Sequence, residues 1–286
     1  MSDPETPLDP GLYIVATPIG NLGDITLRAL DVLRGVDRIA CEDTRVTRRL
    51  LARYGIEKPL LAYHDHNAVA MRPKLLDRLA AGERIALVSD AGTPLIADPG
   101  YRLVAAAATA GVAVRSIPGP SALTAALAVA GLPTDRVLFL GFLPARRSAR
   151  RAALAAAADV PASLVVYEGP HRLEKSLADM CRVLGDREAA LCRELTKLHE
   201  EVRRDRLERL AAAVAAGEIA ARGEIVLVIA PPDRDERPRD DLEAVLEAAL
   251  ETLSLREAVH AVAWMTKRPR AEVYARALAI KNAREG

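Results

Sequence analysis

Short apolar segments alternate with helical patterns along the first part of this 286-residue chain. Each apolar segment has the length of a strand, and the segments between them repeat apolar residues at helical spacing. This alternation is typical of a parallel sheet that helices cover on both faces. We expect strands at residues 12–16, 38–41, 59–62, 85–88 and 112–117. Helices are expected at residues 25–33, 44–54 and 70–81, and from Asp98-Pro99, an N-cap and first-turn proline, to just before Gly111.

The turn Pro118-Gly119-Pro120 interrupts this pattern and marks the expected junction with a second α/β domain. After a small-residue helix at 121–130, strands are expected at residues 136–140, 163–167, 188–192 and 224–230, with a short antiparallel piece at 200–203. Beyond a proline-rich linker, helical patterns occupy residues 240–252, 255–265 and 270–280, and Ser254 and Glu257 have capping-box spacing. We therefore predict a disordered N-terminus (1–10), a parallel α/β domain (11–117), a second α/β domain (118–231), and a linker with a helical C-terminal region (232–286).

The composition argues against several functional classes. A net charge of +1 gives no general attraction to nucleic acids or membranes, and no apolar run reaches membrane-spanning length. The N-terminus has no signal-peptide pattern, and the three cysteines have no zinc or CxxC spacing, so we expect a cytoplasmic protein. Cys41 and Cys192 are expected to be inert core residues. With one Trp and two Phe, a sheet face that stacks RNA bases is not expected.

Polar loops follow four of the predicted parallel strands. The segment Ser89–Gly100 combines carboxylates, two glycines and two prolines, and other polar loops follow Ala16, Cys41 and Ala62. Small molecules bind at the carboxyl ends of parallel strands, so these loops should converge on one site. Each loop alone is equally compatible with ordinary helix capping, as with Asp24 or Asp43. Neither a dinucleotide fingerprint nor a P-loop occurs, and His64-Asp65-His66 lacks a fourth ligand, so no metal is predicted.

A series of segments in fixed order carries a resemblance to a known family. They are Thr17–Leu22 with Asp24-Ile25, Glu42–Arg45, His66-Asn67, Ser89–Gly100, Pro118–Ala122, Gly141–Pro144, Tyr167–Arg172 and Arg193–Lys197. Together they resemble the tetrapyrrole methylase superfamily of S-adenosylmethionine-dependent enzymes, with its class III methyltransferase fold. Within it they are most similar to the branch that methylates ribose 2′-hydroxyls of small-subunit (16S) ribosomal RNA. The first loop, Thr-Pro-Ile-Gly-Asn, departs from the glycine-rich loop of tetrapyrrole-acting members and favours the RNA branch.

The resemblance implies that S-adenosylmethionine lies in a cleft between two α/β domains. The cofactor residues that it implies are Pro18, Asp90, Ala91, Gly92, Thr93, Ile96, Ala97, Ser121, Ala122, Tyr167, Leu195 and Glu224. The implied reaction is methyl transfer to the ribose 2′-hydroxyl of a cytidine in the decoding region of 16S rRNA, by a homodimer acting on the RNA or the small ribosomal subunit.

This reaction requires alignment of the reacting atoms and is helped by a base. Acidic candidates for a catalytic role are Asp43 and Glu168, followed by Asp24. RNA contact is expected from two arginine clusters, whose members are Arg45, Arg48, Arg49, Arg146, Arg147, Arg150 and Arg151. Each cluster alone is also typical of a solvated helix face. The basic segment 267–270 is compatible with RNA contact, oligomerisation or packing.

Two alternatives remain open at this point. One is a C-methyltransferase of the same superfamily that acts on a corrin or porphyrin. The other is a ribosome-associated RNA-binding module that retains a degenerate pocket.

Overall fold

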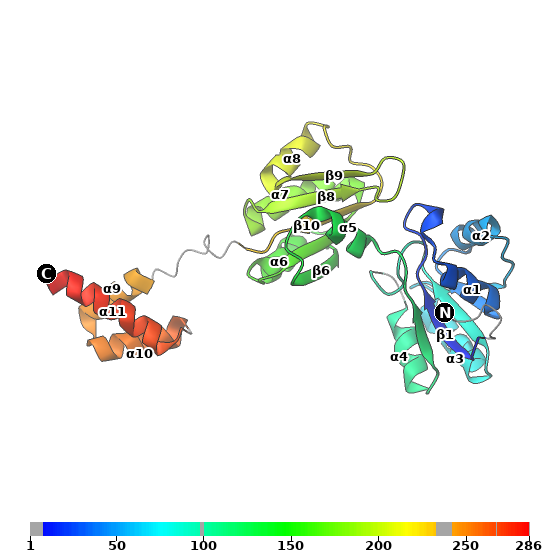
Figure 1. Cartoon of the computed structure of the whole chain (residues 1–286), viewed down its shortest axis with the longest axis horizontal. Coiled ribbons are helices and arrows are strands. Elements are labelled where there is room, and N and C mark those ends of the chain that lie inside the picture. Colours follow the sequence, from blue (N-terminus) through cyan, green and yellow to red (C-terminus); the bar gives the residue numbers. More distant parts are fainter. Residues whose placement is uncertain (1–7, 98–99, 233–241, 267, 286) are drawn as a thin grey trace. The chain divides into compact units, whose positions relative to one another are not determined.

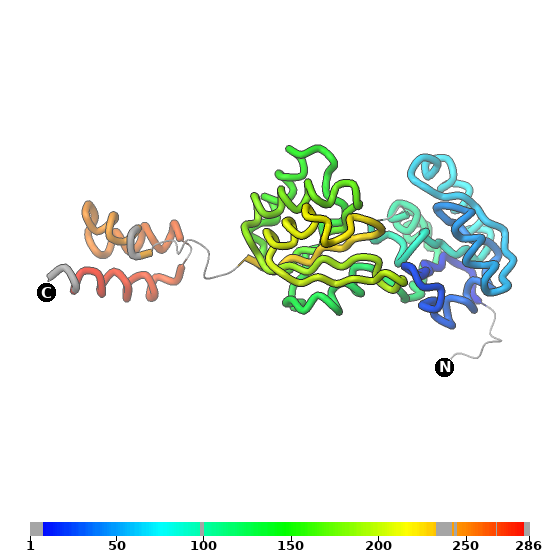
Figure 2. The backbone as a smooth tube through the Cα atoms, turned by 90° about the horizontal axis from the view of Figure 1, so that it is seen from above, coloured from blue at the N-terminus to red at the C-terminus, as the bar shows by residue number. Residues whose placement is uncertain are grey.

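The structure, a computed structural model, describes residues 8–97, 100–232, 242–266 and 268–285. The chain divides into two compact units, residues 1–231 and 232–286. Both β-sheets lie in the first unit (Figure 1), whose backbone is coloured from blue to yellow in Figure 2. The predicted disordered segment 1–10 falls largely outside the described residues, and the predicted division at residues 117/118 stays a prediction.

The first sheet is entirely parallel, as the alternating pattern predicts. Its strands are β1 (Gly11–Val15), β2 (Arg38–Cys41), β3 (Leu60–Ala62), β4 (Arg84–Val88) and β5 (Val114–Ile117), in the order β3-β2-β4-β1-β5. In the central pairing Leu12 lies opposite Ile85 on β4 and opposite Val114 on β5. The carboxyl ends of all these strands therefore lie at one edge, which places the four polar loops there.

Helices bury both faces of this sheet. On β1, Tyr13 and Val15 pack in one core cluster, whereas Leu12 and Ile14 pack in another, because successive strand residues point to opposite faces. The first cluster includes residues of α1 (Leu27–Gly35) and α2 (Thr44–Arg53). The second includes residues of α3 (Ala68–Ala80) and α4 (Tyr101–Thr109). The central strands β1 and β4 are nearly continuous apolar runs because helices cover both of their faces.

Side-chain caps mark the beginnings of α1 and α2. Thr26, not Asp24, caps α1 by accepting the Ala29 N–H (3.1 Å), and Asp24 belongs to the short 3-10 helix η1 (Leu22–Asp24). Asp43 caps α2 by accepting the Arg45 N–H (2.8 Å). Gly100 precedes α4, and the predicted cap at Asp98-Pro99 lies outside the described residues.

The second sheet is mixed. Its strands are β6 (Val137–Phe142), β7 (Ser163–Glu168), β8 (Glu188–Arg193), β9 (Glu201–Arg206) and β10 (Ile225–Ile229), in the order β6-β7-β10-β8-β9. Only β6 and β7 pair in parallel. The helices α6 (Arg147–Ala158), α7 (Leu173–Leu184) and α8 (Leu207–Ala215) cover one face, and α5 (Ala122–Ala130) covers the other. The expected antiparallel piece at 200–203 is the beginning of the longer β9.

The second unit consists of packed helices: α9 (Leu242–Thr252), α10 (Leu255–Thr266) and α11 (Arg270–Glu285) (Figure 1). Leu246, Val259 and Val273 are fully buried or nearly so in its core. The predicted capping box is present, since Ser254 N–H donates to Glu257 Oε2 (3.1 Å) and Glu257 N–H to Ser254 Oγ (3.4 Å). Among the residues that the structure describes, every helix is too short or too polar to cross a membrane.

Candidate active site

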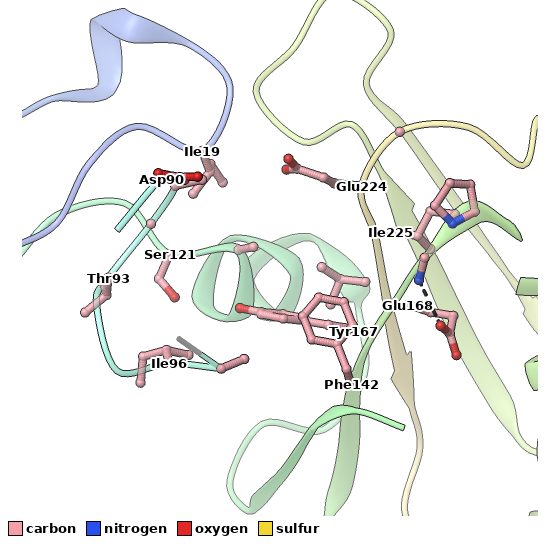
Figure 3. A pocket seen from close by; sticks show the side chains of 18 residues that line it. Ile19, Asp90, Thr93, Ile96, Ser121, Phe142, Tyr167, Glu168, Glu224 and Ile225 are labelled. Carbon is pink, nitrogen blue, oxygen red and sulfur yellow. Dashed lines mark hydrogen bonds between the residues drawn. The ribbon is translucent and has the colours of Figure 1, made fainter. Parts of the chain in front are cut away.

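A cavity of about 310 Å³ opens at the carboxyl edge of the parallel sheet (Figure 3). Small-molecule sites span ~300–1,000 Å³, so this volume suits a small cofactor. One wall consists of Ile19, the loop after β4 (Asp90–Thr93, Ile96 and Ala97) and the beginning of α5 (Ser121 and Ala122). The other wall consists of Phe142, residues 167–170 after β7 and residues 223–226 at the beginning of β10.

Backbone hydrogen bonds fix the loop after β4. Thr17 and Gly92 exchange both backbone hydrogen bonds (2.9 and 3.0 Å), and the Thr17 hydroxyl donates to the Ser89 carbonyl (3.1 Å). Leu95 and Ala97 have positive φ angles of 78° and 63°, a backbone conformation that costs energy in non-glycine residues. The loop is thus held in a strained conformation beside the cavity, as is common at functional sites.

Two carboxylates face each other across the cavity. Figure 3 shows Asp90 on one wall and Glu224 on the other. Asp90 Oδ1 accepts the backbone N–H of Asp43 (2.9 Å), so the loops after β2 and β4 are tied together. The lining also includes the aromatic side chains of Phe142 and Tyr167, whose rings form an edge-to-face pair with centroids 5.6 Å apart. Such a cavity suits a ligand that combines a positive charge with an apolar or aromatic body.

The Glu224 side of the cavity is supported by an ion-pair cluster. Glu194 accepts the Glu224 N–H (2.9 Å) and the Lys197 ammonium (2.8 Å), and Lys197 Nζ lies 3.4 Å from Glu224 Oε2. Burial works against the charge on Lys197, but the hydrogen bond to Glu194 and the charge of Glu224 outweigh it, so the pKa of Lys197 is raised. Lys197 is therefore a fixed cation and not a base at neutral pH.

The structure brings most of the predicted cofactor residues together. All of them line this cavity except Pro18 and Leu195. Pro18 lines an adjacent cavity of about 360 Å³ that shares Asp90 with the first one. Leu195 does not line the cavity itself; it is buried in the apolar cluster that includes the wall residues Ile19 and Val226, and its role toward the cofactor stays a prediction. Its neighbour Glu194 supports the cavity instead.

Several wall residues were not predicted from the sequence. They are Ile19, Phe142, Glu168 as a wall residue, Gly169, Pro170, Gly223, Ile225 and Val226. Ile19, Phe142 and Pro170 lie within the motifs that carry the family resemblance, so proximity in the chain was an available signal. Gly223 has φ +75°, and a Cβ atom there would lie 2.1 Å from Glu194 Oε1, which only the folded structure reveals.

The acidic candidates for catalysis differ sharply in their surroundings. Glu168 is 2% exposed, and its carboxylate binds the Ser176 hydroxyl, the Arg172 guanidinium (3.2 Å) and the Gly169 N–H (2.8 Å). Its hydrogen-bonding capacity is thus used within the protein, which contradicts a role as catalytic base. Hydrogen bonds from Arg45 lower the pKa of Asp43 to about 2, so Asp43 is a very weak base. Asp24 lies in η1 and is not part of the cavity wall.

Comparison with known proteins gives a consistent result. The family model described as "Tetrapyrrole (Corrin/Porphyrin) Methylases" matches residues 11–211. The chain belongs to the tetrapyrrole methylase family. A second family model, described as "RsmI C-terminal HTH domain", matches residues 236–281 of the chain.

Curated relatives match nearly the whole chain. A "Ribosomal RNA small subunit methyltransferase I" of Mesorhizobium japonicum is 48% identical over 280 residues, covering 98% of this chain and 95% of the relative. A protein of the same name from Vibrio cholerae is 52% identical over 221 residues, covering 77% of each chain. Among solved structures, cobalt precorrin-4 methyltransferase has a TM-score of 0.57 at 19% identity, covering 76% of this chain and 93% of its own. That last likeness concerns the fold alone.

The arginines of the two predicted clusters differ in exposure and in their ion pairs. Arg45, Arg48 and Arg49 are exposed on α2, although Arg45 also pairs with Asp43. Arg146 and Arg147 are exposed where α6 begins. Arg150, however, is 4% exposed and binds the buried Asp179 (2.6 Å), as does the half-buried Arg151 (2.6 Å). The expectation that Arg150 contacts RNA does not fit its burial, whereas the RNA contact expected of the partly exposed Arg151 stays a prediction.

A few remaining predictions concern metals and thiols. No group of three or more His, Cys, Asp or Glu residues in the described part of the chain is arranged to hold a metal ion. Cys41 and Cys192 are fully buried, as expected, and burial raises the pKa of Cys192 to about 11. Both thiols are therefore unreactive at neutral pH.

Proposed function

We propose that this protein transfers a methyl group from S-adenosylmethionine to the ribose 2′-hydroxyl of a cytidine in the decoding region of 16S ribosomal RNA. The observation that carries the proposal is the cavity that Asp90 and Glu224 face from opposite walls. When bound, S-adenosylmethionine supplies a methyl group on a positively charged sulfur. Carboxylates on both sides of a small, partly apolar cavity match that charge, and the aromatic wall of Phe142 and Tyr167 matches its adenine.

The wall of the cavity allows close contact with a ligand. At Gly92, which has φ +81°, a Cβ atom would lie 3.3 Å from the Ile19 side chain and 3.9 Å from the Pro120 carbonyl. A side chain larger than that of glycine therefore has no room at position 92, and backbone atoms line this part of the cavity. Backbone N–H and C=O groups in such a loop can orient the polar ends of a small molecule. These features support placing the cofactor against residues 90–97.

The choice of RNA as the acceptor follows from the curated relatives and from surface charge. Relatives at 48% and 52% identity carry the name of a small-subunit ribosomal RNA methyltransferase, whereas the corrin-modifying structure is 19% identical. Exposed Arg48 and Arg49 on α2 lie next to the loop of Asp43, which contacts Asp90. They suit phosphate groups of an RNA strand that approaches this edge.

In this scheme the chain contributes mainly orientation. In-line transfer of an activated methyl group is accelerated chiefly by holding the acceptor oxygen and the methyl carbon in line. Neither Glu168 nor Asp43 is suited to accept the hydroxyl proton, for the reasons given above. The proton then passes to solvent, and the fixed geometry of the loops after β2 and β4 provides most of the catalytic effect.

Two measurements test this proposal. Calorimetric titration of the purified protein with S-adenosylmethionine should show saturable binding, and its absence would favour an RNA-binding module with a degenerate pocket. Mass mapping of 16S rRNA from cells that lack the protein should show loss of one ribose methyl group on a decoding-region cytidine. Persistence of that methyl group would contradict the proposal and return attention to a tetrapyrrole substrate.

We further infer a cytoplasmic homodimer, since the proposed substrate is the small ribosomal subunit and the family resemblance suggests a dimer. Light scattering of the purified protein at several concentrations tests the dimer.

A further inference from the structure

The second unit exposes apolar and aromatic side chains that its own core does not need. Trp264 and Met265, at the end of α10, are 82% and 60% exposed, and Tyr274 and Leu278 on α11 are also exposed. The core of the same unit is complete without them, since Val259, Val262, Val273 and Ala277 fill it. Large exposed apolar groups on a small unit indicate a surface for a partner.

The exposed residues of α11 form a defined stripe. Arg270, Tyr274, Leu278 and Lys281 are spaced at i, i+4, i+8 and i+11, which places them on one side of a helix. The buried residues Val273, Ala277 and Ile280 lie on the neighbouring side and hold the helix against α9 and α10. The stripe thus offers an aromatic ring and an aliphatic side chain between two cations. We call these four residues the α11 stripe.

The charge distribution says what kind of partner fits. Acidic residues predominate in the sequence of α9 and the beginning of α10, with Glu247, Glu251 and Glu257. From residue 267 onward the sequence is basic, with Lys267, Arg268, Arg270, Arg276, Lys281 and Arg284 against Glu272 and Glu285. The single aromatic ring of this segment, Tyr274, thus lies among cations, a combination that suits single-stranded nucleic acids, where bases stack on aromatic side chains and phosphates pair with Lys or Arg.

We propose that the α11 stripe, together with Trp264, binds an unpaired segment of RNA by base stacking. This inference rests on the proposed function for its choice of RNA as partner. The model that matches residues 236–281 is that of a helix-turn-helix (HTH) domain. A helix in such a domain usually reads the groove of a duplex through side chains that match base edges. The stripe carries Tyr and Leu at its centre, which match base faces instead. The second unit is then a substrate-binding element that acts separately from the cofactor cavity.

Trp264 is the single tryptophan of the chain, so tryptophan fluorescence reports on the second unit alone. The full-length protein is titrated with a short single-stranded RNA of the decoding region and with the same RNA annealed to its complement. We expect saturable quenching of Trp264 by the single strand and at least a severalfold weaker affinity for the duplex. Equal affinity for both, or RNA binding detected by anisotropy with unchanged fluorescence, overturns the proposal. Quenching by whole small subunits but not by RNA also overturns it, in favour of a protein partner.

Variants separate stacking from charge. Because stacking on one aromatic side chain contributes about 1–3 kcal/mol per base, Tyr274→Ala should weaken single-strand affinity roughly tenfold. Arg270→Ala should reduce the salt dependence of binding. Tyr101→Ala, which removes an exposed tyrosine of α4, serves as the matched control and should change neither. Circular dichroism confirms that each variant folds. Titration with S-adenosylmethionine, whose cavity lies in residues 1–231, shows separately whether the proposed function holds.

Discussion

The side-chain stem of Lys197 lies directly against Gly20. A Cβ atom on Gly20 would be 2.4 Å from Lys197 Cγ and 2.8 Å from its Cε. The neighbouring Asn21 N–H donates to the Thr196 hydroxyl (3.1 Å), so two contacts join the loop after β1 to the loop after β8. Because Lys197 also binds Glu194 and Glu224, this contact connects the first sheet's loops to the far wall of the cavity.

Gly20→Ala should therefore disturb the cavity through Lys197. The added methyl group has no room unless the side chain of Lys197 moves. Such a movement weakens the ion pair between Lys197 and Glu224. We expect the affinity for S-adenosylmethionine, measured by calorimetry, to fall about tenfold, in line with the ~1–3 kcal/mol typical of overpacking.

A double-mutant cycle tests this mechanism. Truncation of the lysine in Gly20→Ala/Lys197→Ala removes the atoms that collide with the new methyl group. In the Lys197→Ala background, the Gly20→Ala change should then have little further effect. Strictly additive effects would show that Gly20 acts through something other than Lys197.

Asp90→Asn should weaken cofactor binding while preserving the loop. Asparagine keeps an oxygen that can accept the Asp43 N–H, but it removes the negative charge that faces the cavity. Loss of a charged partner corresponds to about 1.5–3 kcal/mol, so we expect at least a tenfold loss of affinity for S-adenosylmethionine. Asp77→Asn, an exposed carboxylate on α3, is the matched control. Unchanged affinity in Asp90→Asn would mean that the cofactor lies elsewhere.

Arg150 and Arg146 should behave as different kinds of residue despite their closeness in sequence. Arg150→Ala leaves the buried Asp179 without one of its two 2.6 Å ion pairs, and breaking a buried pair costs about 3–5 kcal/mol. Urea unfolding should show this loss. Arg146→Ala, by contrast, should leave stability unchanged and make the salt dependence of RNA binding shallower. A stable Arg150→Ala variant with reduced RNA affinity would restore the sequence-based expectation.

The ion pair of Asp37 with Arg84 should give stability that depends on pH. Hydrogen bonds from Arg84 lower the pKa of Asp37 from 3.8 to about 2. A lowered pKa means that the pair stabilises the folded state at neutral pH and loses this effect as pH falls from 4 towards 2. Asp37→Asn should lower the unfolding free energy by about 1 kcal/mol at pH 7, because the pair is partly exposed. The difference from the wild type should shrink at pH 3 and below.

The exposed pair of Asp31 and Arg34 on α1 provides the control for this experiment. Asp31→Asn should change stability little at any of these pH values, since both side chains are more than half exposed. A constant difference between Asp37→Asn and the wild type from pH 7 to pH 2.5 would contradict the linkage.

Local sequence patterns were sufficient to predict much of the secondary structure and the edge of the first sheet where the polar loops lie. Leu12 and Ile14 alternate with Tyr13 and Val15 in a fully apolar run, which already specifies a strand buried on both faces. Parallel strands place their following loops at one edge, so the location of Asp90 and the loops near it followed from the order of elements. Ser254 and Glu257, which are three residues apart, likewise predicted where α10 begins.

The sequence by itself therefore determined the elements, the parallel sheet and the edge at which the predicted cofactor residues gather, because these depend on periodicity and on contacts between near neighbours. Only the tertiary structure decided which charged side chains remain available at that edge. The sequence suggested an RNA contact for Arg150 and a catalytic role for Glu168, yet Asp179 and Ser176 on α7 bind these two side chains in the interior. Contacts such as Lys197 on Gly20 join residues 177 positions apart (197 minus 20), and no local pattern encodes the packing that brings them together.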